Sequence, residues 1–158
     1  MAVTCLPAWP LVLFGVLEPA ALIWAYVLRV QNPATFYASQ APNHALKPAD
    51  FHPQARGVTL TLLNVYLLLA ALAVVCTFTT KQTTTRWYLV AVALADLGHI
   101  YATYAAVGPG YFWDFAGWSD MIWGNVGVSA FLHGNRWLTV MGAFGALTSG
   151  RTAKGKRA

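Results

Sequence analysis

Four long apolar stretches alternate with shorter polar stretches along the chain. They run from about Trp9 to Leu28, Val58 to Phe78, Trp87 to Val107, and Asp120 to Trp137 or slightly beyond. Each supplies the roughly 20 residues that a helix needs to cross the hydrocarbon core of a membrane. The pattern predicts an all-α membrane fold, a four-transmembrane-helix bundle formed by residues 1–150, with a short basic tail at 151–158.

Composition supports a membrane protein. Hydrophobic residues make up 58% of the 158 residues, charged residues only 9%, and the mean hydropathy is +0.52, whereas charged residues make up about 25% of a soluble domain. The first stretch lacks a basic leader and contains Glu18, so it is interpreted as a retained helix rather than a signal peptide. The expected connections are a polar, proline-rich loop from Gln31 to Arg56, the turn "KQTTTR" and the loop "GPGYFWDFAGWSD".

An even number of crossings places both termini on one side of the membrane. The cations expected on that side are Lys81, Arg86, Arg151, Lys154, Lys156 and Arg157, against Arg29, Lys47 and Arg56 on the other. The positive-inside rule then predicts cytosolic termini. An integral, multi-pass protein of the endoplasmic reticulum is expected, with a basic tail that attracts anionic lipid.

Other partners receive little support from the sequence. No basic face with base-stacking residues is visible, so nucleic-acid binding is not expected. Cys5 and Cys76 are too few for a metal framework, and at cytosolic helix ends they are not expected to form a disulfide. The expected partners are membrane lipid and a lipophilic small molecule, and the oligomeric state stays open.

Two carboxylates fall near the middle of predicted membrane helices. Glu18 and Asp96 each lie nine residues from the expected cytosolic end of their stretch, a depth of roughly 13 Å at 1.5 Å per residue. A charged residue at the bilayer centre costs about 2.5 to 3.5 kcal/mol on insertion scales. His99 lies one turn beyond Asp96 on the same helix face. The spacing predicts that all three face the bundle interior at nearly one level.

Further polar side chains mark the second and fourth stretches. Asn125, Ser129, His133 and Arg136 follow one another at helical spacing and predict a polar stripe, and Asn64 adds a polar position on the second stretch. Lipid cannot satisfy such groups, so they are expected to turn inward. Interhelical hydrogen bonding explains the amides and Ser129 equally well. Arg136 either pairs with a carboxylate or extends to the lipid headgroups, and His133 alone would be a packed histidine.

Three sequence segments resemble a known family. "LEPAALIWAY", "ALADLGHIYATY" and "FWDFAGWSDMIWGNVGVSAFLHGNRW" are similar to small fungal four-helix membrane proteins that are known mainly as a domain of unknown function and are sometimes encoded in secondary-metabolite gene clusters. The family pattern matches Glu18, Pro19, Asp96, His99, Trp118, Trp123, Gly124, Asn125 and Arg136. A more distant, architectural resemblance links the chain to emopamil-binding-protein-like isomerases and membrane-bound terpene cyclases. Those enzymes place carboxylates inside a small helical bundle.

Acid-base chemistry is the reaction that these residues favour. Two carboxyl groups at one depth in a dry interior cannot both ionise cheaply, so one is expected to stay protonated. The prediction is a cofactor-free isomerase or cyclase for a terpenoid, sterol-like or polyketide substrate, with Glu18, Asp96 and His99 as catalytic residues. The predicted substrate-binding residues are Asn64, Tyr101, Trp123, Asn125, Ser129, His133 and Arg136.

Three alternatives remain open at this point. A mixed metal site could combine Asp96, His99, His133 and Glu18, although no repeated histidine motif supports it and no metal is expected. A pericyclase would mainly shape its substrate. A non-catalytic scaffold or lipid-binding subunit would need the same fold and would use the carboxylates as a buried polar network.

Overall fold

The computed structural model describes residues 3–45 and 51–148, and the regular elements in these ranges are helices. They are α1 (Ala8–Val12), η1 (Leu13–Leu17), α2 (Glu18–Val30), α3 (Pro33–Ser39), α4 (Pro53–Thr77), α5 (Gln82–Phe112), η3 (Phe115–Gly117), α6 (Asp120–Ile122), η4 (Trp123–Val128) and α7 (Ser129–Val140). η1 and η4 are π-helical turns that join the α-helical pieces on either side. The prediction of an all-α fold is confirmed.

Three helical runs in the described part of the chain are long and apolar enough to cross a membrane: Ala8–Val30, Pro53–Thr77 and Gln82–Phe112. The most apolar 18-residue segments of these runs have mean hydropathies of 2.0, 2.4 and 1.4, and only 22% of each segment is buried inside the protein. Apolar surface of this extent fits a lipid environment. The fourth predicted segment forms a continuous helical run over residues 120–140, but it is not apolar enough to join these three. The count of four membrane helices therefore stays a prediction.

The expected loop between Gln31 and Arg56 is partly helical. α3 begins directly after its N-cap residue Asn32, whose side-chain oxygen accepts a hydrogen bond from the Thr35 backbone N–H at 3.2 Å. An asparagine cap followed by proline at the first helical position favours a helix start even in a polar segment. α4 also begins inside the expected loop, at Pro53. The prediction of an uninterrupted loop was wrong for these two pieces.

α5 is longer than its apolar pattern predicts. It continues past Val107 to Phe112 across a kink at Gly108, whose φ is 77°. Glycine adopts this left-handed conformation without the steric cost of a Cβ atom. The next residue, Pro109, lacks a backbone donor, so the kink falls where the helical hydrogen-bond ladder is already interrupted. The expected glycine and aromatic loop thus begins as helix.

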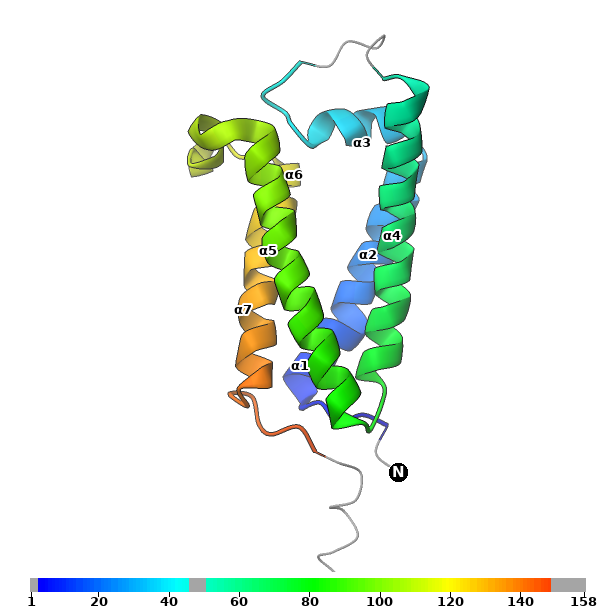
Figure 1. Cartoon of the computed structure of the whole chain (residues 1–158), viewed down its shortest axis with the longest axis vertical. Coiled ribbons are helices and arrows are strands. Elements are labelled where there is room, and N and C mark those ends of the chain that lie inside the picture. The colour runs from blue at the N-terminus through cyan, green and yellow to red at the C-terminus, as the bar shows by residue number, and fades with distance from the viewer. Residues whose placement is uncertain (1–2, 46–50, 149–158) are drawn as a thin grey trace, which may run out of the picture.

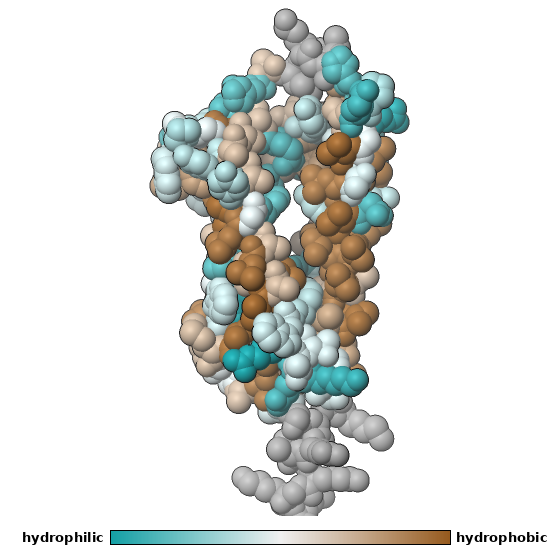
Figure 2. Space-filling model, in the orientation of Figure 1, coloured by the Kyte–Doolittle hydropathy of each residue, from teal (hydrophilic) through white to brown (hydrophobic). Residues whose placement is uncertain are grey.

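The long helices form two pairs. α2 packs along α4, and α5 packs along α7. The pairs converge at the end of the bundle that contains α1 and diverge toward the end that contains α3 and α6 (Figure 1). The space-filling view shows an opening between the pairs in the half where they diverge (Figure 2). Two separate clusters of buried apolar residues pack the helices together, one around Phe14 and Leu89 and one around Phe112 and Ile122.

Both described chain ends lie at the converging end of the bundle (Figure 1). The Cys5 N–H donates to the Thr79 carbonyl at 2.9 Å, and the Thr148 N–H donates to the Cys5 carbonyl at 3.0 Å. The Gln82 amide donates to the Leu147 carbonyl at 2.6 Å. These bonds join the two chain ends to the turn between α4 and α5, which is compatible with the predicted even number of crossings. Lys47 and the basic tail at 151–158 lie outside the described residues, and which side is cytosolic stays a prediction.

Gly15 allows η1 to approach the end of α4 closely. A Cβ atom there would lie 2.9 Å from Thr77 Oγ1 and 3.2 Å from Phe78 Cε2. We expect Gly15→Ala to lower the free energy of unfolding by about 1–3 kcal/mol, the range for overpacked interiors. Thermal unfolding in detergent micelles measures the effect. Gly98→Ala is the matched control, because no heavy atom lies within 4 Å of its Cβ position, and equal losses for the two variants would contradict the close contact.

Candidate functional site

A π-helical turn precedes two of the three helices that carry the main site residues. Pro19 has no N–H and cannot complete the α-helical ladder in the first turn of α2. In the turn before it, the Glu18 N–H donates to the Leu13 carbonyl, five residues back. The second π-helical turn, η4, leads directly into α7. Because five residues rather than four separate the bonded groups, each turn changes the direction in which the following side chains point.

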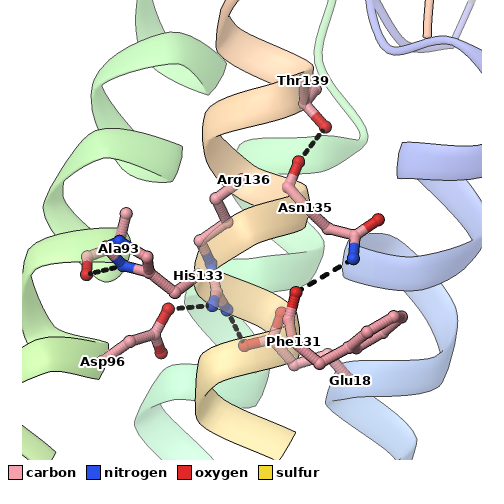
Figure 3. A network of polar contacts seen from close by, with 8 residues as sticks. All are labelled: Glu18, Ala93, Asp96, Phe131, His133, Asn135, Arg136 and Thr139. Atoms are coloured by element: carbon pink, nitrogen blue, oxygen red, sulfur yellow. Dashed lines mark hydrogen bonds and ion pairs between the residues drawn. The ribbon is translucent and has the colours of Figure 1, made fainter. Parts of the chain in front are cut away.

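Arg136 joins the two carboxylates that the sequence places at one level. Its Nη1 donates to Asp96 Oδ2 on α5, and its Nη2 donates to Glu18 Oε1 on α2 (Figure 3). The Arg136 side chain is fully buried, while each carboxylate side chain keeps 11% of its surface accessible. We call these three residues the carboxylate–arginine triad. It links α2, α5 and α7, and it confirms that the two carboxyl groups lie level.

Phe14 contacts the guanidinium, and His133 forms a second link between α7 and α5. The guanidinium Cζ lies 5.1 Å from the centre of the Phe14 ring, a cation-π contact worth about 2 kcal/mol in a site without water. His133 Nδ1 lies 2.8 Å from the Ala93 carbonyl oxygen. A carbonyl only accepts, so Nδ1 carries the proton in this tautomer and Nε2 is left as an acceptor. His133 and Arg136 thus bind α5 at two positions one helical turn apart, Ala93 and Asp96 (Figure 3).

Asn135 ties α7 to the start of the chain. Its side-chain oxygen accepts a hydrogen bond from Trp9 Nε1 at 3.1 Å, and its amide donates to the Phe131 carbonyl at 2.9 Å. The Thr139 hydroxyl donates to the Asn135 backbone carbonyl at 2.7 Å. The two bonds within α7 lie beside the triad (Figure 3), and the bond from Trp9 restricts how far α7 can rotate about its own axis.

Two polar atoms of the triad lack a hydrogen-bond partner among the described residues. They are Glu18 Oε2 and Arg136 Nε, and both atoms are buried. Most buried polar atoms in proteins are hydrogen-bonded. Glu18 therefore uses one carboxyl oxygen for the guanidinium and keeps the other unpaired in the interior.

The structure unites two of the three predicted catalytic residues. Glu18 and Asp96 share Arg136, whereas His99 is half-buried on α5. The His99 imidazole forms no hydrogen bond to a described residue, although its backbone carbonyl accepts one from Thr103 Oγ1 at 3.1 Å. His99 lies one turn beyond Asp96 on α5 but forms no hydrogen bond or ion pair with the triad.

The predicted polar stripe divides into separate contacts. Asn125 and Ser129 are buried, as predicted. The Asn125 amide donates to Gln40 Oε1 at 2.9 Å, close to the end of α3 and away from the triad. Arg136 pairs with both carboxylates and does not extend toward lipid headgroups. The stripe therefore faces inward, but its members do not form one site.

Three predicted substrate-binding residues lie on the protein surface. Tyr101 is 69% exposed and Trp123 is 51% exposed. Asn64 is also exposed, and its amide forms no hydrogen bond to a described residue. The expectation that Asn64 turns inward was wrong, because α4 buries a different face, which includes Leu63 and Ala70.

Other contributors were not found from the sequence. Phe14, Trp9 and Asn135 support the triad, but an apolar ring and a tryptophan near a helix end carry no pattern that distinguishes them from packing residues or an interfacial belt. Asn135 directly precedes Arg136 and lies outside the spacing that defined the stripe. Gln40 lies in the segment for which the sequence predicts a loop.

The triad supplies carboxyl groups and a fixed cation. Among residues 3–45 and 51–148, no group of three or more His, Cys, Asp or Glu side chains is arranged so that it could bind a metal ion. Two surface pockets lie elsewhere, one beside Asn32 and Arg56 and one beside Trp123 and Phe131. The arrangement can therefore exchange protons and form hydrogen bonds at the point where three helices meet.

Comparison with known proteins gives one relationship. No curated protein and no solved structure matches the chain. A family model described as a domain of unknown function, DUF7704, matches residues 3–146. That range contains all three members of the carboxylate–arginine triad and every helix of the described structure. The chain belongs to the DUF7704 family.

Proposed function

We propose that this protein is an intramembrane isomerase or cyclase, in which Glu18 and Asp96 exchange protons with a lipophilic substrate. The observation that carries the proposal is a single buried guanidinium between two carboxyl groups. An ion network of this kind is costly within a membrane, and ionisable residues in membrane spans commonly have functional roles.

Charge balance favours one proton held by the triad. One guanidinium and two carboxylates would carry a net charge of −1, and an uncompensated charge at this depth is expensive. Retention of one proton makes the triad neutral, with one carboxylic acid and one carboxylate side by side. The unpaired, buried Glu18 Oε2 is the atom at which we place that proton.

A neutral triad has the acid and the base that an isomerisation requires. The carboxylic acid donates one proton to an alkene carbon or an epoxide oxygen. The carboxylate removes one proton from a carbon beside the resulting cation. The two steps leave the substrate formula unchanged and the triad neutral, so no cofactor is needed. Proton exchange between the two carboxyl groups then restores the starting state.

Access from the bilayer supports a lipophilic substrate. The two helix pairs diverge on one side of the triad, and the opening between them is visible in Figure 2. Both carboxylate side chains keep some accessible surface, whereas Arg136 keeps none. A terpenoid, sterol-like or polyketide substrate entering between the pairs would therefore meet carboxyl groups rather than the cation.

A second candidate function is a non-catalytic scaffold or lipid-binding subunit. It is favoured by the burial of Glu18 Oε2, which a substrate can reach only if the side chain rotates. In this role the triad would only hold α2, α5 and α7 together. The two functions differ in a measurable way, because only the enzyme transfers protons to a substrate.

The test is proton transfer from solvent to lipophilic compounds. Membranes containing the protein are supplied with terpenoid epoxides, sterols or polyketides in deuterated water, and the extracts are analysed by mass spectrometry. If the protein is an enzyme, the extracts should contain an isomer of the supplied compound that has gained deuterium. This isomer should be missing from membranes that contain the Asp96→Asn variant. If every supplied class is recovered unchanged with wild-type protein, the non-catalytic role is favoured.

A further inference from the structure

An exposed line of polar, small and aliphatic residues runs along α4. The residues Gly57, Thr61, Asn64, Leu68, Ala71 and Val75 are all exposed. They are spaced four, three, four, three and four residues apart, the repeat that places side chains along one helix edge in paired helices. We call them the outer seam. The face of α4 that packs on α2 is a different one, because it contains the buried residues Leu63, Ala70 and Thr77.

Asn64 occupies the least favourable place for an unpaired amide. α4 runs from Pro53 to Thr77, so its midpoint is residue 65. Its most apolar 18-residue segment has a mean hydropathy of 2.4, the highest of the three candidate spans. Asn64 therefore lies near the bilayer centre on an exposed surface. Its carboxamide forms no hydrogen bond to a described residue, and the hydrocarbon core offers it no water. A polar group in this position needs a partner from another chain.

The chemistry of the seam identifies a second copy of this chain as the partner. A carboxamide both donates and accepts hydrogen bonds, so two Asn64 side chains related by a two-fold axis satisfy one another. Copies inserted with the same orientation place Asn64 at the same depth and run their α4 helices in parallel. Small residues flank the amide, since Gly57 has no heavy atom within 4 Å of its Cβ position and Ala71 is exposed, and small residues let helices approach closely in membranes.

We propose that the outer seam of α4 is a homodimer interface, in which Asn64 pairs with Asn64 of a second copy in the membrane. α4 lies at the edge of the molecule, opposite the α5 and α7 pair, and shows a largely apolar surface there (Figures 1 and 2). The dimer leaves the opening between the two helix pairs free. The interface is independent of the carboxylate–arginine triad and of any catalytic role.

Association in liposomes tests the interface. Full-length protein labelled with donor and acceptor dyes is reconstituted in phosphatidylcholine vesicles, and energy transfer is measured against the protein-to-lipid ratio. We expect wild-type protein to dimerise and Asn64→Leu to weaken association roughly tenfold, near the upper end for one intramembrane hydrogen bond. Ala71→Trp should block close approach and weaken association further. Val74→Trp is the matched control, because Val74 is exposed on the same helix outside the seam, and it should associate as wild type does.

Cysteine cross-linking locates the contact. In a Cys76→Ser background, Leu68→Cys should form a disulfide between copies under mild oxidation, whereas Leu62→Cys on another face of α4 should not. A monomeric wild-type protein at every protein-to-lipid ratio would overturn the proposal. Equal weakening by Ala71→Trp and Val74→Trp, or equal cross-linking at positions 62 and 68, would overturn it as well.

Discussion

Replacement of Arg136 by methionine is expected to lower the free energy of unfolding by about 3–5 kcal/mol, the usual loss when one partner of a buried ion pair is removed. Arg136 is fully buried and pairs with Glu18 and Asp96 on two other helices. Methionine fills part of the volume but leaves both carboxyl groups without a cation. Thermal or denaturant unfolding in detergent micelles measures the loss.

Two comparisons separate this ion-pair effect from general damage. Arg136→Met combined with Glu18→Gln and Asp96→Asn should recover much of the lost stability, because the carboxylates no longer need a counter-ion. Arg136→Lys should fall between wild type and Arg136→Met, since an ammonium lacks the planar fork that reaches two carboxylates. Arg86→Met is the control at an exposed arginine. A similar small loss at positions 86 and 136 would contradict the bridging role.

Asp96→Asn and Glu18→Gln are each expected to reduce substrate conversion by about 10²-fold or more, the size of a typical general acid-base contribution. Both amides keep the size of the side chain and can still accept a hydrogen bond from Arg136, but they cannot donate or accept a catalytic proton. The measurement is the rate of product formation in membranes, divided by the amount of folded protein.

Control variants show whether the loss of activity results from changes in the triad alone. His99→Gln should give a weaker loss, because His99 forms no hydrogen bond or ion pair with the triad. Asp120→Asn should have no effect, since Asp120 is exposed at the start of α6. If Asp96→Asn or Glu18→Gln loses activity only in proportion to lost folded protein, the carboxylates are structural and the acid-base mechanism is wrong.

Several features of the site follow from simple counting along the chain. Glu18 and Asp96 lie equally far into their apolar stretches, and helices rise by a constant amount per residue. Their shared level was therefore predictable without any knowledge of tertiary contacts. The buried face of the fourth stretch was predictable for the same reason, because Asn125, Ser129 and Arg136 recur at helical spacing.

Other features of the site and fold depend on tertiary packing, which the pattern of apolar and polar residues does not reveal. Arg136 could pair or extend to lipid headgroups, and the choice depends on the direction that α7 takes after the π-helical turn η4. Apolar residues occur on every side of α4, so periodicity cannot say which face packs on α2 or where Asn64 points. α3 has only seven residues, and its start depends on a local cap at Asn32 in a polar segment.

The protonation of the triad is the property on which the proposed chemistry depends most directly. Infrared spectroscopy of the protein in lipid at neutral pH detects the carbonyl stretch of a protonated carboxylic acid. The chain has only five Asp and Glu residues, and the described ones outside the triad, Asp114 and Asp120, are exposed. We predict one such band in wild-type protein, and its loss in both Glu18→Gln and Asp96→Asn, because either change leaves one carboxylate for one guanidinium. A wild-type spectrum without the band, or a band that persists in both variants, would contradict a shared proton.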